Sequence, residues 1–102
     1  MSDTILRDFF LGFVRIHVLH HAAEEPVYGL GMISELARHG YRLSPGTLYP
    51  LLHDLERRGY LAGENHAGRG RPRRYYTITP AGREVLDEAR LKVGELVDEV
   101  RA

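Results

Sequence analysis

Arginine is concentrated in one short segment of the 102-residue chain. Arg69, Arg71, Arg73 and Arg74 fall within six residues, interspersed with glycine and proline. A guanidinium group is always charged and matches the geometry of a phosphate, so arginines on a turn can contact a nucleic-acid backbone or enter a narrow minor groove. A run of charge is also typical of a solvated loop. The β-prone residues that follow the run favour a hairpin, and with it the contact to nucleic acid.

The net charge of the chain is zero, but the charge is unevenly distributed. Residues 28–76 contain eight basic and four acidic residues, and the two ends carry the compensating negative charge. Binding to a polyanion depends on the local field and not on the sum. A neutral chain with a basic middle is therefore compatible with nucleic-acid binding.

A second set of polar side chains lies in the segment with the clearest apolar stripe. Leucines at i, i+3, i+4 and i+7 predict a helix whose leucine face is buried, and these are Leu48, Leu51, Leu52 and Leu55. On the opposite face, Thr47, Tyr49 and His53 can hydrogen-bond base edges or phosphates, and Arg57 suits a phosphate. Because an α-helix fits the major groove, this face could read DNA. The alternative is an ordinary solvated face.

Three histidines near the end of the first predicted helix could bind a metal ion. His17 and His21 are four residues apart and share a helix face, and His20 offers a second choice. Two imidazoles at this spacing can bind zinc with further ligands, for which Glu24 and Glu25 are nearby. Histidines at a helix end also stabilise the helix dipole, and we prefer this interpretation. We therefore predict no metal site, with His17 and His21 as the candidate ligands should one exist.

Several other classes of function lack their characteristic residues. The chain has no cysteine, which excludes disulfides and thiolate metal sites. It has no glycine-rich phosphate loop after a strand and no His-Glu-x-x-His motif, so we expect neither an enzyme nor a bound cofactor. It shows no basic leader and no apolar run that could span a bilayer, so we expect a cytoplasmic protein without membrane contact.

Glycine, proline and capping residues divide the chain into elements. Helices are expected at 3–23, 28–39 and 44–59, strands at 60–65 and 73–78, and a helix from 79 to the end. Gly40 and Gly59 suit helix C-termini. Ser44 and Thr79 suit helix N-caps, and each is followed by a proline, which favours the first helical position.

Pro50 conflicts with the helix predicted for 44–59. A proline inside a helix removes a hydrogen bond and costs roughly 3 kcal/mol. Either the first turn of this helix is irregular, or Thr47 is its N-cap and Pro50 lies in the first turn.

Three helices, a basic hairpin and a last helix form a winged helix-turn-helix with a C-terminal dimerisation helix. The fold class is thus mainly α with a small β-hairpin. We expect one domain over 1–102, with the winged core at 24–78 and dimerisation helices at 3–23 and 79–102.

The first and last helices are expected to join two copies of the chain. The first is apolar on more than one side, and the last carries an apolar residue at steps of three and four, which is typical of a coiled-coil seam. A small winged core cannot cover both surfaces. The residues expected at the interface are Phe9, Phe13, Leu86, Ala89, Val93, Leu96 and Val100.

Three segments of the chain resemble the PadR family of bacterial transcriptional regulators. Residues 44–61 (SPGTLYPLLHDLERRGYL) are similar to its recognition helix, and residues 70–82 (GRPRRYYTITPAG) to its wing and the start of its last helix. Residues 27–30 (VYGL) are similar to the start of its second helix. The three segments follow the order and spacing of the family, and the resemblance extends over about residues 5–100. The chain length suggests the short branch with a single C-terminal helix.

This resemblance implies a dimeric repressor that binds double-stranded DNA at a palindromic operator. It also implies DNA contacts from the third helix and the wing, and we expect the DNA-binding set to be Tyr28, Ser44, Thr47, Tyr49, His53, Arg57, Arg69, Arg71, Arg73 and Arg74. Some short members bind flat aromatic drugs through a tryptophan on the last helix, which this chain lacks. A small-molecule or metal effector stays open, as does a dimerising interaction domain that has lost DNA binding.

Overall fold

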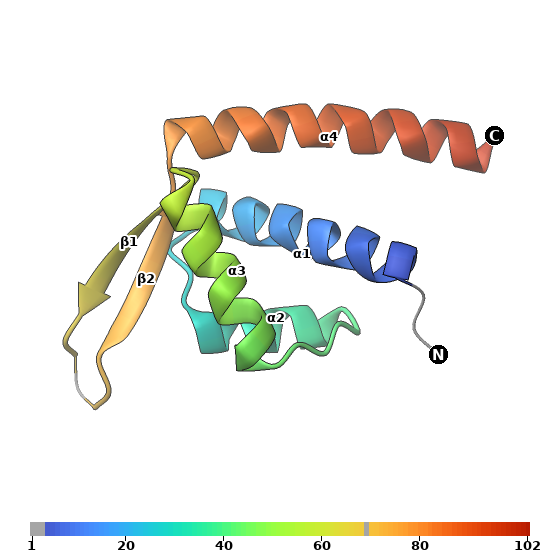
Figure 1. The fold of residues 1–102 in the computed structure, drawn as a ribbon. Coiled ribbons are helices and arrows are strands. Elements are labelled where there is room, and N and C mark those ends of the chain that lie inside the picture. The colour runs from blue at the N-terminus through green and yellow to red at the C-terminus, as the bar shows by residue number, and fades with distance from the viewer. Residues whose placement is uncertain (1–3, 69) are drawn as a thin grey trace.

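The computed structural model describes residues 4–68 and 70–102, and within them four helices and one hairpin follow one another (Figure 1). The fold class predicted from the sequence is confirmed: the chain is mainly helical, with a two-stranded antiparallel hairpin and a long C-terminal helix. The elements are α1 (Thr4–Glu24), α2 (Gly29–Arg38), α3 (Pro45–Arg57), β1 (Leu61–His66), β2 (Arg73–Ile78) and α4 (Pro80–Arg101).

Local signals in the sequence place the helix ends within a residue or two. Gly40 and Gly59 have φ angles of 89° and 85°, in the left-handed region that glycine adopts without strain, and each directly follows the last turn of a helix. Thr79 caps α4 as expected, because its side-chain oxygen accepts a hydrogen bond from the backbone N–H of Gly82 at 3.0 Å.

The structure corrects our treatment of Pro50. Ser44 is the N-cap of α3, and the backbone N–H groups of Thr47 and Leu48 both donate to its carbonyl oxygen, so Thr47 is not the N-cap. The helix runs unbroken through Pro50, which lies in its second turn. The loss of one backbone hydrogen bond is tolerated because the leucine face of α3 is anchored in the core. Ser44 makes no side-chain cap bond, and its Oγ lies 3.3 Å from the Oγ1 of Thr47.

The core forms where all the elements meet, and every leucine of the α3 stripe is buried in it. Residues of α1, α2, the hairpin and the start of α4 pack around that stripe. The buried apolar residues are Val14, Val18, Leu19, Ala22, Val27, Met32, Leu36, Leu48, Leu51, Leu52, Leu55, Leu61, Tyr76 and Leu86. Burial of the leucines leaves the opposite face of α3 for the surface.

The hairpin is attached to the helices through its second strand. β1 and β2 pair from Leu61 opposite Ile78 to His66 opposite Arg73. On the other edge of β2, Val27 and Tyr76 exchange two backbone hydrogen bonds of 2.9 and 2.7 Å. The connection between α1 and α2 thus acts as a short third strand, which fixes the base of the hairpin.

An ion pair fixes the hairpin against α3. Arg74 on β2 contacts both carboxylate oxygens of Glu56 on α3, and its Nη1 donates to the Oδ1 of Asn65 on β1 at 2.8 Å. The hydrogen bonds from Arg74 lower the pKa of the Glu56 carboxyl below its ordinary value of 4.5. Arg74 therefore links both strands to the C-terminal part of α3.

The first turn of α4 is held close to the end of α3. The Oγ1 of Thr79 donates to the carbonyl oxygen of Gly59 at 2.6 Å, and the N–H of Thr79 donates to the carbonyl oxygen of Tyr60 at 3.2 Å. From there α4 runs antiparallel to α1, and the hairpin extends away from it on the side where α2 and the start of α3 lie (Figure 1). The two ends of the molecule are thereby separated: one exposes the hairpin and α3, the other exposes α1 and α4.

Replacing Gly82 by alanine is expected to destabilise the protein. A Cβ at this position would lie 2.2 Å from the Tyr60 carbonyl oxygen and 2.8 Å from the Cγ1 of Ile78. Overpacking of this kind costs about 1–3 kcal/mol, so the melting temperature should fall. Gly94→Ala is the control: its Cβ meets nothing within 4 Å, and removing a glycine from a helix stabilises it by roughly 0.5–1 kcal/mol. Equal stability of the two variants would contradict the close packing at Gly82.

The contribution of the Glu56–Arg74 pair should depend on pH. Because the pKa of Glu56 is lowered by folding, the pair stabilises the protein above pH 4.5, and this stabilisation is lost as the pH falls through the lowered pKa. Glu56→Gln should melt below the wild type at neutral pH, and the difference should shrink in acid. Glu64→Gln, at an exposed position of β1, should change little at either pH. A pH-independent difference for Glu56→Gln would contradict the ion pair.

Candidate nucleic-acid interface

A cleft of about 560 Å³ lies where the start of α2, the exposed face of α3 and the hairpin meet. It joins residues that are up to 48 positions apart in the sequence. Its lining is Tyr28, Gly29, Leu30, Tyr49, His53, Gly70, Arg71, Pro72, Arg73, Arg74 and Tyr76. Six residues of the expected DNA-binding set are among them. The structure therefore brings together side chains from the helix-turn-helix and from the hairpin.

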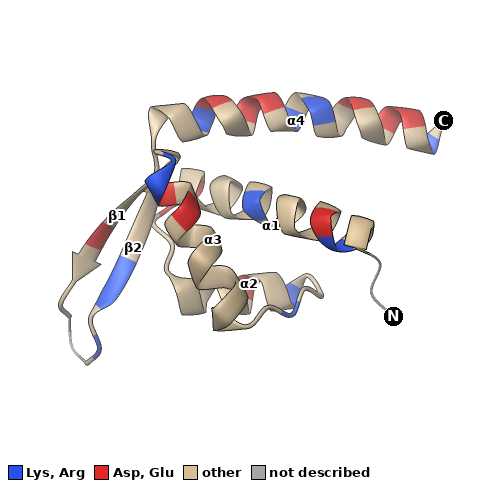
Figure 2. Cartoon of the chain, viewed as in Figure 1, with Lys and Arg blue, Asp and Glu red and all other residues tan. Residues whose placement is uncertain are grey.

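The positive charge of the cleft comes from the hairpin. Figure 2 shows basic residues, all of them arginine, on β2 and at the tip of the hairpin, whereas the first turns of α3 are without charge. Residues 45–53 of α3 contain no Asp, Glu, Lys or Arg. A cationic hairpin beside an uncharged, hydrogen-bonding helix suits a duplex, whose phosphates flank a groove lined by neutral base edges.

Tyr49 is held in place by the start of α2. A Cβ on Gly29 would lie 1.9 Å from the Cε1 of Tyr49, so the ring lies directly over the Gly29 backbone. The side chain remains 37% exposed. Tyr49 thus packs the two helices against each other and still presents part of its ring at the cleft.

Tyr28 positions Arg73 in a similar way. The Arg73 guanidinium lies 4.4 Å from the centre of the Tyr28 ring, a cation–π geometry. The Tyr75 ring also contacts Tyr28, with ring centres 5.3 Å apart and the planes tilted by 56°. A hydrogen bond with Tyr75 and the proximity of Tyr28 raise the pKa of Arg73 further above its ordinary value. Arg73 is therefore a fixed positive charge beside the start of α2.

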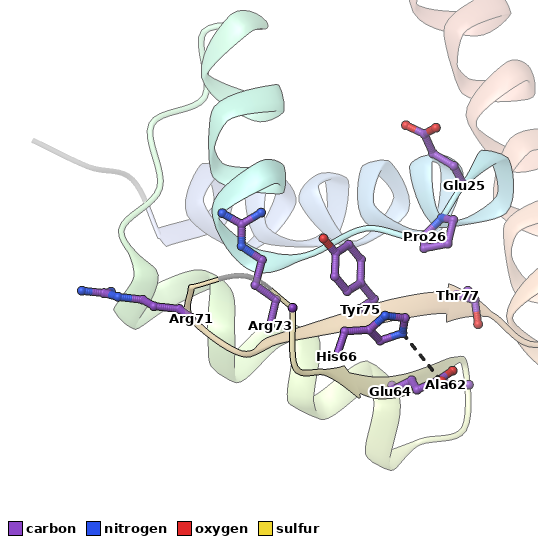
Figure 3. A pocket seen from close by; sticks show the side chains of 11 residues that line it. Glu25, Pro26, Ala62, Glu64, His66, Arg71, Arg73, Tyr75 and Thr77 are labelled. Atoms are coloured by element: carbon purple, nitrogen blue, oxygen red, sulfur yellow. Dashed lines mark ion pairs between the residues drawn. The ribbon is translucent and has the colours of Figure 1, made fainter.

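The hairpin arginines differ in what they contact. Arg74 is engaged with Glu56 and Asn65, so its first role is to brace the hairpin. Arg71 extends away from the other labelled side chains around the outer hollow of the hairpin (Figure 3). Arg69 lies outside the described residues. Of the described hairpin arginines, Arg71 and Arg73 line the cleft without taking part in this brace.

The polar residues of α3 are spread over its length. Ser44 and His53 are exposed and Thr47 is half-buried. Arg57 lies at the far end, where it pairs with Asp54, and Arg58 contacts the same carboxylate at 3.0 Å. Arg57 is not among the residues that line the cleft.

Sequence reasoning missed three contributors to this surface. Tyr75 contacts Tyr28 on one side and His66, whose ring centre is 5.0 Å away, on the other. The alternation of β2 carries this signal, because buried Tyr76 requires its neighbour Tyr75 to point to the opposite face. Leu30 is an exposed apolar residue at the cleft rim, and Pro72 shapes the hairpin turn beside it.

The candidate metal ligands lie outside the cleft. The rings of His17 and His21 are stacked on α1 with centres 6.1 Å apart. The structure adds two neighbours from α2 that the sequence did not indicate: ligand atoms of His21, Glu35 and His39 lie within 4.8 Å of one another. Burial, followed by repulsion from His39 and His21, lowers the pKa of His17 below its ordinary value of 6.5, so this imidazole is neutral near pH 7.

The residues expected at a dimer interface divide into two groups. Leu86 is buried and Ala89 half-buried within the chain, while Phe13 stacks on Phe9 with ring centres 5.8 Å apart. The rest of the set is exposed, together with apolar residues that the seam pattern missed. The exposed group on α1 and α4 is Ile5, Leu6, Phe9, Leu91, Val93, Leu96, Val97 and Val100. Among the described residues, no helix is long and apolar enough to cross a membrane.

Comparisons with known proteins agree over nearly the whole chain. Residues 18–88 match the model of the transcriptional regulator PadR-like family. Transcriptional regulator Rv3488 of Mycobacterium tuberculosis (strain ATCC 25618 / H37Rv) is 53% identical over 95 residues, which cover 93% of this chain and 89% of that protein.

Solved structures lead to the same family. A PadR family transcriptional regulator from Eggerthella lenta DSM 2243 superposes with a TM-score of 0.83 at 36% identity, covering 95% of this chain and 86% of that one. A PadR-like transcriptional regulator from Bacillus cereus strain ATCC 14579 gives 0.79 at 30% identity, covering 97% and 94%. The chain therefore belongs to the PadR-like family of transcriptional regulators, as a short member with the winged helix-turn-helix fold.

Proposed function

We propose that this regulator is a sequence-specific repressor that binds a palindromic operator as a homodimer and is released by an effector. The observation that carries the proposal is the cleft, where an uncharged, hydrogen-bonding helix face adjoins a hairpin with two outward-facing arginines. The molecule has two distinct ends: α3 and the hairpin form the end proposed to face DNA, and α1 and α4 form an apolar end. Such a protein represses by occupying its operator.

In this proposal α3 enters the major groove. Its buried leucines fix the rotation of the helix, so Tyr49 and His53 face the cleft and Thr47 stays partly exposed in the first turn. These side chains offer hydroxyl and imidazole groups that donate to and accept from base edges. Their short reach requires close approach, which the absence of charged side chains on this part of α3 allows.

The hairpin contributes affinity more than sequence discrimination. Arg71 and Arg73 carry their charges beside the groove that α3 would occupy, where they neutralise phosphates and release counterions. Phosphate contacts orient a protein on DNA without reading sequence. The cation–π contact of Arg73 with Tyr28 reduces the freedom that this side chain would lose on binding.

The apolar end of the molecule supports the homodimer. The far half of α4 is exposed along its whole circumference, with Leu96 54% and Val100 71% exposed, and the first turns of α1 expose Ile5 and Phe9. Such contiguous apolar surface is typical of an interface. In a twofold dimer each contact is made twice, and two copies of α3 would lie about one DNA turn, ~34 Å, apart.

The alternative function is an interaction domain that dimerises without binding DNA. The exposed apolar helices would serve both functions equally, so they do not discriminate between them. The arginines of the hairpin favour DNA, because a surface that only dimerises gains nothing from positive charges at its opposite end.

Replacing Arg71 and Arg73 together by alanine should reduce the salt dependence of DNA binding. Each lost phosphate contact lowers the slope of log K against log salt by about 0.9, so the double variant should lose roughly one to two units. The measurement is fluorescence anisotropy with duplex DNA from upstream of the gene, over a series of salt concentrations. Arg101→Ala removes a charge at the end of α4 and should leave the slope unchanged. An unchanged slope in the double variant would place these arginines away from DNA.

His53→Ala should instead reduce discrimination between the operator and a scrambled duplex, by roughly 1–3 kcal/mol if the imidazole makes a good base contact. Tyr49→Phe is the companion variant, because it retains the packing on Gly29 and removes only the hydroxyl. If the wild type binds neither duplex, the interaction-domain alternative is correct.

Replacing Leu96 by glutamate should dissociate the dimer without unfolding the monomer. Leu96 is exposed within the chain, so its substitution costs the isolated fold little, whereas a charge in an apolar interface is costly. Sedimentation velocity at micromolar concentration should show a dimer for the wild type and a monomer for the variant. Asp98→Ala, on another face of α4, should stay dimeric. A monomeric wild type would overturn both the dimer and the palindromic operator.

A further inference from the structure

A cluster of histidines between α1 and the end of α2 is not used by the DNA-binding or dimer proposals. His17 and His21 come from α1, while Glu35 and His39 come from the last turn of α2 and its C-cap. Ligand atoms of His21, Glu35 and His39 lie within 4.8 Å of one another, and the ring of His17 is centred 5.6 Å from that of His39. Two imidazoles and a carboxylate from two different helices thus converge on one point.

A second observation marks this point as a place for a ligand. The Nδ1 of His17 is buried and has no hydrogen-bond partner among the described residues. Buried polar atoms in proteins are almost always satisfied, so a nitrogen without a partner, on a ring centred 5.6 Å from that of His39, needs an explanation. Phe13 and Tyr41 pack around the His17 ring, with ring centres 4.7 and 5.8 Å away, and supply an apolar wall.

We propose that His21, Glu35 and His39 bind a divalent transition-metal ion of the zinc class, with the His17 ring beside the site and a water molecule as the fourth ligand. Two histidines and a glutamate form a nitrogen and oxygen donor set that zinc commonly takes, and imidazole also suits cobalt, nickel and copper. Calcium and magnesium prefer oxygen ligands and are disfavoured here.

The geometry requires only small side-chain movements. Tetrahedral zinc with bonds of about 2.0–2.1 Å holds its ligand atoms ~3.4 Å apart. The Nε2 of His39 and the Oε2 of Glu35 are already 3.2 Å apart, and the remaining pairs in the group of three are within 4.8 Å. The His39 side chain is about half-exposed, so its ring can rotate toward an ion without disturbing the core.

The competing contacts at this site are weak. Arg38 also contacts Glu35, at 3.2 Å, and would give up that contact when a cation arrives. The Arg38 side chain is largely solvent-exposed, and exposed ion pairs add little to stability. His21 also lies 3.9 Å from the exposed carboxylate of Glu24. Among the described residues, the only other group of possible metal ligands that includes His21 consists of His20, His21 and Glu24.

The grouping of His20, His21 and Glu24 is the poorer site. All three residues lie in the last two turns of α1, and the Nδ1 of His20 is already 3.1 Å from an Arg90 nitrogen on α4. The cross-helix grouping instead joins two elements. Since His39 is followed directly by the turn that leads to α3, an ion at this site would fix the helix-turn-helix to α1.

This position gives the ion a regulatory consequence, which rests on the proposed DNA-binding function. α1 contributes to the proposed dimer interface, and α3 to the proposed DNA contacts. A bound ion that links α2 to α1 would change the relative orientation of the two recognition helices in a dimer. The affinity for the operator would change with it. Metal binding itself is independent of this second step.

The experiment uses the full-length chain without a polyhistidine tag, freed of metal by a chelator and dialysis. Isothermal titration with Zn²⁺ should show one ion per chain, and the melting temperature should rise with Zn²⁺. Co²⁺ should give visible absorption bands of a four-coordinate site. His39→Ala should weaken binding by about 100-fold, because loss of a supporting group alone costs about 10–100-fold. His20→Ala is the matched control and should bind like the wild type.

Two results would overturn the site: no Zn²⁺ binding by the wild type, or loss of binding in His20→Ala with His39→Ala unaffected. Operator binding is then measured with and without Zn²⁺ for the wild type and His39→Ala. A zinc-dependent change of affinity only in the wild type supports the regulatory role, and no change in either overturns that role alone. Absence of operator binding under all conditions contradicts the proposed function, while the calorimetric result still decides the metal site.

Discussion

Burial of the leucine stripe of α3 is the constraint on which the rest of the molecule depends. Leu48 and Leu52 are fully buried, so the helix cannot rotate about its axis without exposing them. That single fact decides which side chains of α3 face outward, and it keeps the helix intact around Pro50 although a backbone hydrogen bond is lost. The buried leucines, which DNA would not contact, therefore determine which face of α3 is proposed to bind DNA.

Contacts around the hairpin fix its two strands to the helices whose orientation the leucines determine. Arg74 ties β2 to Glu56 at the end of α3, and Tyr28 holds Arg73 at the start of α2. The hairpin is thus attached to both helices of the helix-turn-helix by different arginines. Arginine in this segment thus has a structural use, and we propose that Arg71 and Arg73 also present their charge to DNA.

The sequence predicted the elements well because their signals are local. The step of the leucines, the glycines at 40 and 59, and the Thr79–Pro80 pair each act within one or two helical turns, and each is confirmed. The sequence did not predict which of several similar residues contact other parts of the fold. Nothing in the order of the arginines shows that Arg74 is opposite Glu56, 18 positions away. The His21–Glu35–His39 grouping was equally hidden, because it depends on how two helices cross. The seam pattern for α4 omitted Leu91 and Val97, since a strict heptad describes a narrower interface than this exposed helix offers.

The same reasoning explains why α1 has the composition of a helix that is buried on several sides. Its C-terminal half supplies Val14, Val18 and Leu19 to the core, its first turns expose Ile5 and Phe9, and its histidines face the end of α2. A helix that only closed a core would need one apolar stripe. If the exposed first turns pack against a second copy, a change in what α1 contacts on one side would shift its packing on the others. If the proposed dimer and metal site are correct, α1 is the element through which a signal at α2 reaches the spacing of the two recognition helices, because its residues lie in the core, in the proposed interface and beside the end of α2.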